Sequence, residues 1–168
     1  VWANRLRIAP ASFAELLRAE GLRPEPLAWR PGAFRLPSEL KPGNHWWYLA
    51  GLGHSQEEVS QLPVALLDPQ PGERVLDLCA APGGKSAQIV QAMDNRGTLV
   101  ANDALVGRVR ALRANLERLG ALNVSATVYD GSNLPGAAGR FAAIHGRRPA
   151  AGARARSGPP GLCVAPRW

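Results

Sequence analysis

The stretch VLDLCAAPGGKS, residues 75–86, constrains the fold of this chain more than any other part of the sequence. An apolar strand pattern, Val75 to Leu78, runs into a loop of small residues that opens a predicted helix, Gly84 to Met93. Strand patterns recur at Thr98 to Ala101 and at Val124 to Tyr129. Strands that alternate with helices at this spacing predict a parallel sheet with right-handed crossovers. In such sheets, ligands bind beyond the carboxyl ends of the strands.

The segment between the second and third strands predicts an amphipathic helix that stops at Gly120. Apolar residues recur at the spacing of one helix face, and arginines occupy other positions. The apolar residues of the helix are Val109, Leu112, Leu116 and Leu119, and its arginines are Arg108, Arg110, Arg113 and Arg118.

The front of the chain, residues 1–50, predicts a small α/β module. Trp2 to Ile8 is strand-like. Ser12, with Glu15 three residues later, predicts a capping box for a helix from Phe13 to Glu20. Further along, two short strands and a helix kinked at its proline are expected. These are the strands Leu27 to Trp29 and Ala33 to Leu36, and the helix Gln56 to Leu67 with Pro63 at the kink.

The composition argues against a membrane protein and against a metal site. No apolar run approaches the roughly 18 residues that a membrane span requires. The two cysteines, Cys79 and Cys163, are too few for a disulfide framework or for a zinc site built from cysteines. We therefore expect a cytoplasmic, monomeric protein without a metal.

The net charge of +7 comes mostly from the end of the chain. Residues 136–168 contain six arginines and no acidic residue, whereas residues 1–135 contain 14 basic and 13 acidic residues. A basic stretch of this kind either binds phosphate backbones or is simply disordered. We expect residues 51–144 to form the main domain and residues 145–168, rich in Arg, Gly, Pro and Ala, to be a disordered tail.

The small-residue loop suggests three kinds of chemistry, which its spacing separates. A phosphate loop requires G-x-x-x-x-G-K-[ST], and counting back from Lys85 puts Cys79 where the first glycine belongs. A dinucleotide loop requires G-x-G-x-x-G, which the run AAPGGK does not supply. A thiol nucleophile is disfavoured because Cys79 belongs to the loop itself. A phosphate-loop nucleotide site remains a minor alternative.

Carboxylates at the ends of the next two strands favour a nucleoside cofactor. Asp103 follows the second strand, about 20 residues past the loop, where a carboxylate suits the two hydroxyls of an unphosphorylated ribose. Asp130 follows the third strand and could accept a hydrogen bond from the exocyclic amine of adenine. Each aspartate alone also fits a helix cap. Together with the loop, they indicate a site for a nucleoside cofactor.

This part of the chain resembles the S-adenosylmethionine-binding half of RNA cytosine-5 methyltransferases of the Nop/Sun type, which include bacterial ribosomal-RNA enzymes and nucleolar relatives. The resemblance rests on VLDLCAAPGGKS, on the spacing to AND at Asp103, on RVRALRANLERLGALNV and on YDG at Asp130. It is strong over residues 55–135 and looser at the front, where ANRLRI is similar to the family's RNA-binding N-terminal module. It implies a Rossmann-like α/β methyltransferase core with an incomplete parallel sheet, and RNA, ribosomal RNA in particular, as the partner.

The resemblance also implies roles for single residues. The loop would cradle the methionine part of S-adenosylmethionine, Asp103 would bind the ribose, and Asp130 would bind the adenine edge. Lys85 would help to place the methionine carboxylate or support the loop. By this resemblance, the loop residues that bind the cofactor are Cys79, Ala80, Ala81, Pro82, Gly83, Gly84 and Lys85.

The resemblance does not extend to the family's catalytic cysteines. Those enzymes carry one cysteine in D-A-P-C-S-G and another in a later T-C motif, whose thiolate adds to carbon 6 of cytosine. The resemblance implies a fourth strand at Phe141 to Ile144, which in the family leads into D-A-P-C-S-G. After Ile144 this sequence instead reads HGRRPAAGARARSGPPGLCVAPRW, and Cys163 stands in neither motif. We therefore expect no catalytic residue here and no methyl transfer by this chain alone, and interpret residues 136–168 as frame-shifted or truncated. The alternative is a non-catalytic remnant that binds the cofactor or RNA.

The front of the chain also carries aromatic and basic residues suited to an RNA surface. Such surfaces stack bases on aromatic rings and bind phosphates with arginine, although aromatic residues of a small domain more often fill its core. The residues are Trp2, Trp29, Trp46, Trp47 and Tyr48, with Arg5, Arg7, Arg30 and Arg35.

Overall fold

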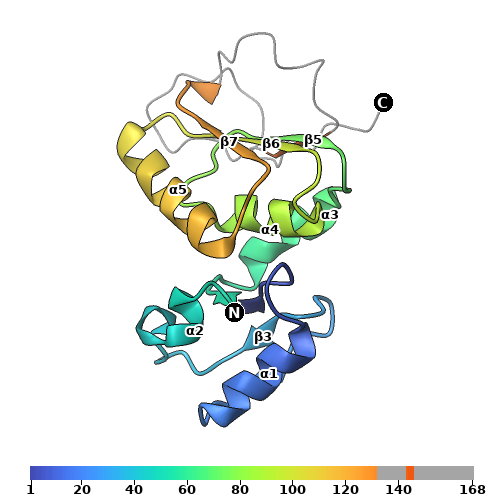
Figure 1. Ribbon diagram of the computed structural model, residues 1–168, viewed down its shortest axis with the longest axis vertical. Coiled ribbons are helices and arrows are strands. Elements are labelled where there is room, and N and C mark those ends of the chain that lie inside the picture. The colour runs from blue at the N-terminus through green and yellow to red at the C-terminus, as the bar shows by residue number, and fades with distance from the viewer. Residues whose placement is uncertain (132–142, 146–168) are drawn as a thin grey trace.

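The alternating pattern in the second half of the chain forms a parallel sheet in the computed structural model, which describes residues 1–131 and 143–145 (Figure 1). Its strands are β5 (Arg74–Asp77), β6 (Thr98–Asn102), β7 (Val124–Thr127) and β8 (Ala143–His145). They lie in the order β7-β6-β5-β8, and each neighbouring pair is parallel. Asp77 is in register with Ala101 of β6 and His145 of β8. The carboxyl ends of these strands therefore meet at one edge of the sheet.

The strand expected from Phe141 to Ile144 is confirmed in part. Residues 143 and 144 belong to β8, which extends to His145, whereas residues 141 and 142 lie outside the described part of the chain. Through its pairing with β5, β8 places the end of the described chain beside the strand that leads into the small-residue loop. The tail expected at residues 146–168 also lies outside the described residues.

Three helices lie between the sheet and the N-terminal module in Figure 1. They are α3 (Leu62–Leu67), α4 (Gly84–Ala92) and α5 (Val106–Leu119). The apolar face predicted for α5 is buried, with Val109, Leu112, Leu116 and Leu119 each at most 7% exposed. As predicted, the helix ends at Gly120, whose φ of +77° is a conformation that glycine adopts without steric penalty.

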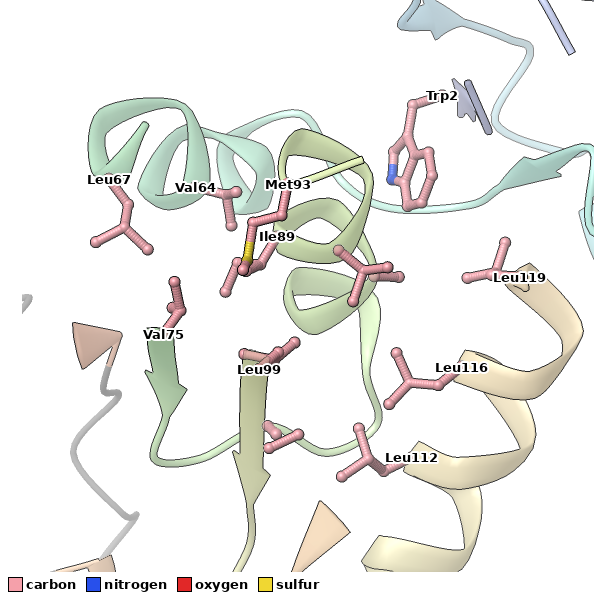
Figure 2. Packing of buried hydrophobic residues seen from close by; sticks show 14 of the residues in the cluster. Trp2, Val64, Leu67, Val75, Ile89, Met93, Leu99, Leu112, Leu116 and Leu119 are labelled. Atoms are coloured by element: carbon pink, nitrogen blue, oxygen red, sulfur yellow. The ribbon is translucent and has the colours of Figure 1, made fainter. Parts of the chain in front are cut away.

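The main core fills the space between these helices and the sheet. Figure 2 shows Val75 and Leu99 of the two central strands packed against Ile89 and Met93 on the α4 side. All four side chains are fully buried, and burial of a side chain of this size stabilises a fold by roughly 1.5 to 3 kcal/mol. Trp2 belongs to the same cluster, so the first residues of the chain also contribute to this core.

The helix predicted over Gln56 to Leu67 is instead two short pieces. A 3-10 turn, η2 (Val59–Gln61), is followed by α3. Pro63 lies in the first turn of α3, not inside a longer helix. A proline is well tolerated there because its missing N–H would have no partner within the helix.

The N-terminal module is built from one helix of ten residues and several very short elements. The long strand expected from Trp2 to Ile8 stops at Ala3, because the carbonyl of Asn4 accepts hydrogen bonds from later N–H groups and turns the chain. The two later strands are shorter than expected and one is shifted toward the N-terminus. The elements are β1 (Trp2–Ala3), α1 (Pro10–Ala19), β2 (Glu25–Pro26), β3 (Phe34–Arg35), η1 (Pro42–Asn44), α2 (Trp46–Leu49) and β4 (Gly53–His54).

The capping box predicted from Ser12 and Glu15 does not form. Helix α1 begins at Pro10, and its N-cap, Ala9, makes no side-chain hydrogen bond. Proline at the first helical position has the backbone angle that a helix needs. Ser12 therefore lies inside the helix, where its hydroxyl has no N-cap role.

A buried amide joins the module to the core. Asn4 is 1% exposed, and its Nδ2 donates to the carbonyl oxygens of Gly51 and Leu119, each at 2.8 Å. Leu119 is the last residue of α5, where helix carbonyls lack partners within the helix. Gln91 of α4 donates to the carbonyl of Ala3 at 2.7 Å. The module is therefore fixed to both helices that follow the predicted cofactor segments.

Arg118 forms a second polar contact between the two parts. Its Nη2 lies 2.9 Å from Nδ1 of His54, and its guanidinium lies 4.0 Å from the ring centre of Tyr48. Burial, together with the nearby Arg118 charge, lowers the pKa of His54 to about 4. At neutral pH the histidine is therefore uncharged and accepts the hydrogen bond from Arg118.

Candidate functional site

The predicted site residues lie at the carboxyl edge of the sheet. The small-residue loop leaves β5 and enters α4 at Gly84. Asp103 directly follows β6, and Asp130 comes three residues after β7. The loop and Asp103 are in contact, since the N–H of Ala81 donates to Oδ2 of Asp103 at 3.3 Å. Asp130 is exposed at the same edge.

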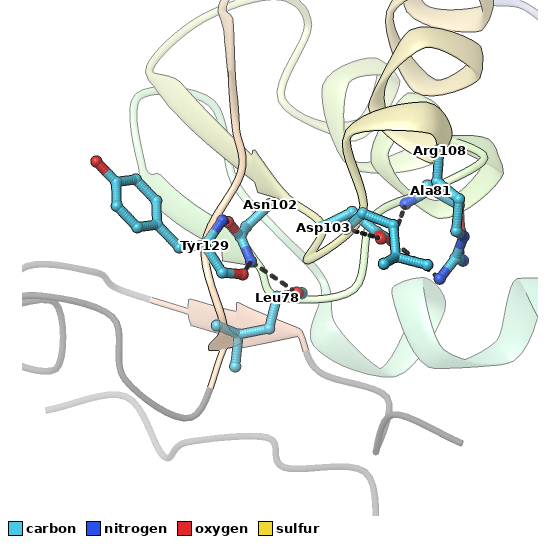
Figure 3. A network of polar contacts seen from close by, with 7 residues as sticks. Leu78, Ala81, Asn102, Asp103, Arg108 and Tyr129 are labelled. Atoms are coloured by element: carbon cyan, nitrogen blue, oxygen red, sulfur yellow. Dashed lines mark hydrogen bonds and ion pairs between the residues drawn. The ribbon is translucent and has the colours of Figure 1, made fainter. Parts of the chain in front are cut away.

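Asp103 is a buried carboxylate with several donors around it (Figure 3). Beyond the Ala81 contact, its Oδ1 accepts from the N–H of Leu105 at 3.2 Å. Its Oδ2 lies 3.3 Å from Nη1 of Arg108. The side chain of Asp103 is 3% exposed and that of Arg108 is 52% exposed. The arginine therefore covers the carboxylate from the solvent side.

Arg108 also holds the loop directly, a role that the sequence did not predict. Its Nη2 donates to the carbonyl of Ala81 at 2.8 Å. The sequence pattern places Arg108 only among the polar positions of the helix. One available signal was its position in the first turn of α5, since helix side chains point back toward the N-terminus. In that direction lies Asp103, the acid that the arginine pairs with.

Two glycines allow the loop to pack closely against its surroundings. Gly83 has a φ of +105°, and a Cβ there would lie 3.1 Å from Cδ1 of Leu112. At Gly84, a Cβ would lie 3.3 Å from Nε2 of His54. Larger residues would push the loop away from α5 and β4. The other loop residues vary in burial: Ala80 and Ala81 are buried, Cys79 and Lys85 are half-buried, and Pro82 is exposed.

A second buried carboxylate, Asp77 at the end of β5, was also missed by sequence reasoning. The hydroxyl of Ser86 donates to its Oδ2 at 2.7 Å, and both side chains are 0% exposed. Burial raises the pKa of Asp77 to about 6, although hydrogen bonds from Ser86 and the Cys79 backbone oppose this shift. A phosphate loop would use the Ser86 hydroxyl to hold magnesium. Its bond to Asp77 therefore disfavours the phosphate-loop alternative.

Asp77 should make the stability of the protein depend on pH. Its folded-state pKa of about 6 lies above the unfolded value of 3.8, so the free energy of unfolding should fall as pH rises from about 4 to about 6 and stay low above that. Asp77→Asn should remove this decrease. The free energy of unfolding of the variant, relative to that of wild type, should therefore rise by about 2 kcal/mol between pH 4 and pH 7. Urea unfolding at both pH values measures the difference. Parallel pH profiles for the two proteins would contradict it.

The aromatic residues expected to form one RNA surface are divided between core and surface. Trp2 and Trp47 are 2% and 0% exposed, so both belong to the interior. Trp29 and Trp46 are 41% and 52% exposed. Tyr48 is half-buried beneath Arg118. The single surface proposed from all five aromatic residues is therefore wrong, and only two of them remain well exposed.

Neither a membrane-spanning helix nor a metal cluster occurs in the described ranges. No helix within residues 1–131 or 143–145 is long and apolar enough to cross a membrane. The same residues contain no group of three or more His, Cys, Asp or Glu side chains that could hold a metal ion.

The parallel sheet, its helices and the acid-lined carboxyl edge define a Rossmann-like methyltransferase fold. A solved methyltransferase homologue from Pyrococcus horikoshii is 36% identical and superposes with a TM-score of 0.71, over 76% of this chain and 42% of that one. The chain belongs to the 16S rRNA methyltransferase RsmB/F family, whose family model matches residues 64–147, half of the sequence. This confirms the family resemblance and the fold class predicted from the sequence.

The curated relatives are ribosomal-RNA methyltransferases. A mouse 28S rRNA (cytosine-C(5))-methyltransferase is 40% identical over 140 residues, which is 82% of this chain and 18% of the relative. A ribosomal RNA small subunit methyltransferase F from Shewanella amazonensis is 36% identical over 132 residues, 76% of this chain and 28% of the relative. The chain thus spans less than a third of the length of these relatives.

Proposed function

We propose that this chain binds S-adenosylmethionine at the carboxyl edge of its sheet, as the cofactor-binding part of a ribosomal-RNA cytosine-5 methyltransferase. One observation carries the proposal: the carboxylate of Asp103 is held against the backbone of Ala81 and beside Arg108. This contact brings an acid suited to ribose hydroxyls next to a loop of small residues. Family membership supports the same cofactor.

The loop has the properties that close approach of a cofactor requires. A Cβ at Gly83 or Gly84 would lie 3.1 or 3.3 Å from a neighbouring side chain, so the loop backbone lies close to α5 and β4. The N-terminus of α4 follows directly, and helix N-termini favour negatively charged groups such as a carboxylate. We assign the methionine part of the cofactor to Cys79–Lys85, with Lys85 near its carboxylate.

Asp103 retains hydrogen-bonding capacity for a ribose. A carboxylate offers about four acceptor positions, and the described donors to Asp103 are Ala81, Leu105 and Arg108. Since the carboxylate is buried beneath the half-exposed Arg108, we propose that this arginine moves aside when the ribose hydroxyls bind. Asp130, exposed at the same edge, is assigned to the exocyclic amine of adenine.

The bound cofactor would supply an electrophilic methyl group, and cytosine-5 transfer also needs a cysteine thiolate to activate the base. The sequence contains neither D-A-P-C nor T-C, and Cys79 is part of the cofactor loop. We therefore propose that these 168 residues bind the methyl donor without transferring it.

Transfer of a tritiated methyl group to ribosomal RNA separates this proposal from an active enzyme. We expect no transfer by the wild-type chain under conditions where the cofactor binds. Transfer that disappears on replacing Cys163 with serine would instead identify an active enzyme with an unrecognised nucleophile. Transfer that persists with Cys79 and Cys163 both replaced would exclude cysteine chemistry of this kind.

RNA is the proposed partner of the front module. Trp29 and Trp46 are exposed, and Arg5 and Arg7 are exposed on the same module. If these residues stack bases and bind phosphates, filter binding to ribosomal RNA should weaken steeply with added salt. An absence of binding at low salt would remove this part of the proposal. We further propose that the protein is cytoplasmic and monomeric. Light scattering of the purified chain gives its molar mass and so tests whether it is a monomer.

A further inference from the structure

Asn102 is a buried amide that connects the ends of three strands (Figure 3). It is the last residue of β6 and is 0% exposed. Its Nδ2 donates to the carbonyl oxygens of Leu78 at 3.2 Å and Tyr129 at 2.9 Å. Its Oδ1 accepts from the hydroxyl of Thr127 at 3.0 Å and the N–H of Tyr129 at 2.9 Å. The side chain therefore uses both of its donors and both lone pairs of its acceptor.

Two of the three residues that the Asn102 side chain holds, Leu78 and Tyr129, lie directly before residues assigned to the cofactor, and so does Asn102 itself. One partner belongs to the segment after β5, another to the segment after β7, and Asn102 itself ends β6. The backbone of Asn102 adds a further tie, since its carbonyl accepts from the N–H of Ala80 at 2.8 Å. The neighbouring pairs in the sequence are Leu78 with Cys79, Asn102 with Asp103, and Tyr129 with Asp130.

Of the three partners of the Asn102 side chain, Tyr129 is held most tightly, because it makes two of the four hydrogen bonds. Asn102 binds both the N–H and the carbonyl oxygen of Tyr129, so rotation of that backbone would break a hydrogen bond to the buried Asn102 side chain. Leaving a buried donor or acceptor without a partner costs about 1 to 3 kcal/mol. Asp130 is the next residue along the chain and is exposed, so its position depends on the backbone of Tyr129.

We propose that Asn102 is a positioning residue that sets the selectivity of the site for adenine. It acts through Asp130, whose carboxylate would accept a hydrogen bond from the exocyclic amine of the base. This inference rests on the proposed function, because it takes the nucleoside site as given. It adds a buried residue that does not touch the cofactor and yet determines which base the site prefers.

The test compares two ligands that differ only at the base. Calorimetry of the full chain is carried out with S-adenosylhomocysteine and with S-inosylhomocysteine, in which a keto oxygen replaces the exocyclic amine. Wild type should prefer the adenosyl ligand by roughly tenfold or more, because the keto oxygen would face the Asp130 carboxylate. Asn102→Ala should reduce this preference to about threefold or less.

Asn95→Ala is the matched control for lost stability. Asn95 also binds two backbone groups, the carbonyl of Gly120 at 3.0 Å and the N–H of Leu122 at 2.9 Å, but at the opposite edge of the sheet. Its φ of +54° disfavours alanine, so this variant should be destabilised as well. A loss of selectivity caused by general destabilisation would appear in both variants, whereas positioning predicts it for Asn102→Ala alone.

A milder variant covers the case in which Asn102→Ala does not fold. Thr127→Val removes only the hydroxyl that donates to Oδ1 of Asn102, and it should lower the adenine preference by roughly threefold. If Asn102→Ala and Thr127→Val, where they fold, keep the adenine preference of wild type, the inference is overturned. Wild-type binding of both ligands with equal affinity would also overturn it, by removing the role of Asp130. Absence of binding of either ligand to wild type would refute the proposed function itself.

Discussion

Asp103→Asn is expected to weaken S-adenosylmethionine binding by about a hundredfold. The substitution keeps the size of the side chain but removes the charge that pairs with Arg108, and it turns one acceptor into a donor beside the N–H groups of Ala81 and Leu105. Charge-assisted hydrogen bonds are about twice as strong as neutral ones. Loss of the ribose contacts and of the loop anchor together corresponds to about 3 kcal/mol. Calorimetric titration of the variant measures the change.

Asp94→Asn is the matched control for this substitution. Asp94 also faces an arginine, Arg96, at 3.3 Å, but both side chains are 66% exposed in the turn before β6. Exposed ion pairs contribute little, and this turn lies at the opposite edge of the sheet. Cofactor affinity should therefore stay within about twofold of wild type. Equal affinities for wild type and Asp103→Asn would show that the ribose does not bind at this carboxylate.

Gly51→Ala is expected to lower the free energy of unfolding by about 3 kcal/mol or more. Gly51 has a φ of +71°, and a Cβ there would lie 2.0 Å from the carbonyl oxygen of Arg118. That oxygen belongs to the backbone of α5, so relieving the clash would require a shift of the backbone at Gly51 or at Arg118. The carbonyl of Gly51 also accepts the buried amide of Asn4. The substitution should therefore separate the module from the core. Urea unfolding followed by tryptophan fluorescence measures this effect, because Trp2 is buried at the same boundary.

Gly43→Ala provides the comparison for the glycine substitution. Gly43 lies in η1, and a Cβ there would meet no atom within 4 Å. Its unfolding free energy should stay within about 0.5 kcal/mol of wild type. If Gly51→Ala and Gly43→Ala unfold at the same urea concentration as wild type, the tight contact between α5 and the module is not present in solution.

The sheet and its helices were predictable because they depend on local patterns. Strand and helix periods in residues 75–120 identify the elements, and Gly120 marks the end of α5 without any knowledge of tertiary contacts. The front module was harder to predict because its strands have only two residues each, too few for a pattern. The capping-box pattern at Ser12 predicted the wrong helix start, because Pro10 begins the helix two residues earlier.

The polar network of the site could not be derived from the sequence, because its contacts join distant residues. Asp103 was predicted from its place after a strand, but its partner Ala81 is 22 residues away. Asn102 contacts Tyr129, 27 residues away, and nothing in the sequence marks an asparagine inside a strand as a link between strands. The burial of Trp2 and Trp47 could not be predicted from the sequence either, because aromatic residues suit a core as well as an RNA surface.

Calorimetric titration of the 168-residue chain with S-adenosylmethionine is the most direct test of the central claim. We predict saturable binding of one molecule per folded chain, displaced by S-adenosylhomocysteine and unaffected by ATP with magnesium. Circular dichroism of the same sample establishes that the chain is folded. A folded chain that gives no saturable heat with S-adenosylmethionine, or one whose binding ATP with magnesium displaces, would contradict the assignment of Cys79–Lys85, Asp103 and Asp130 to this cofactor.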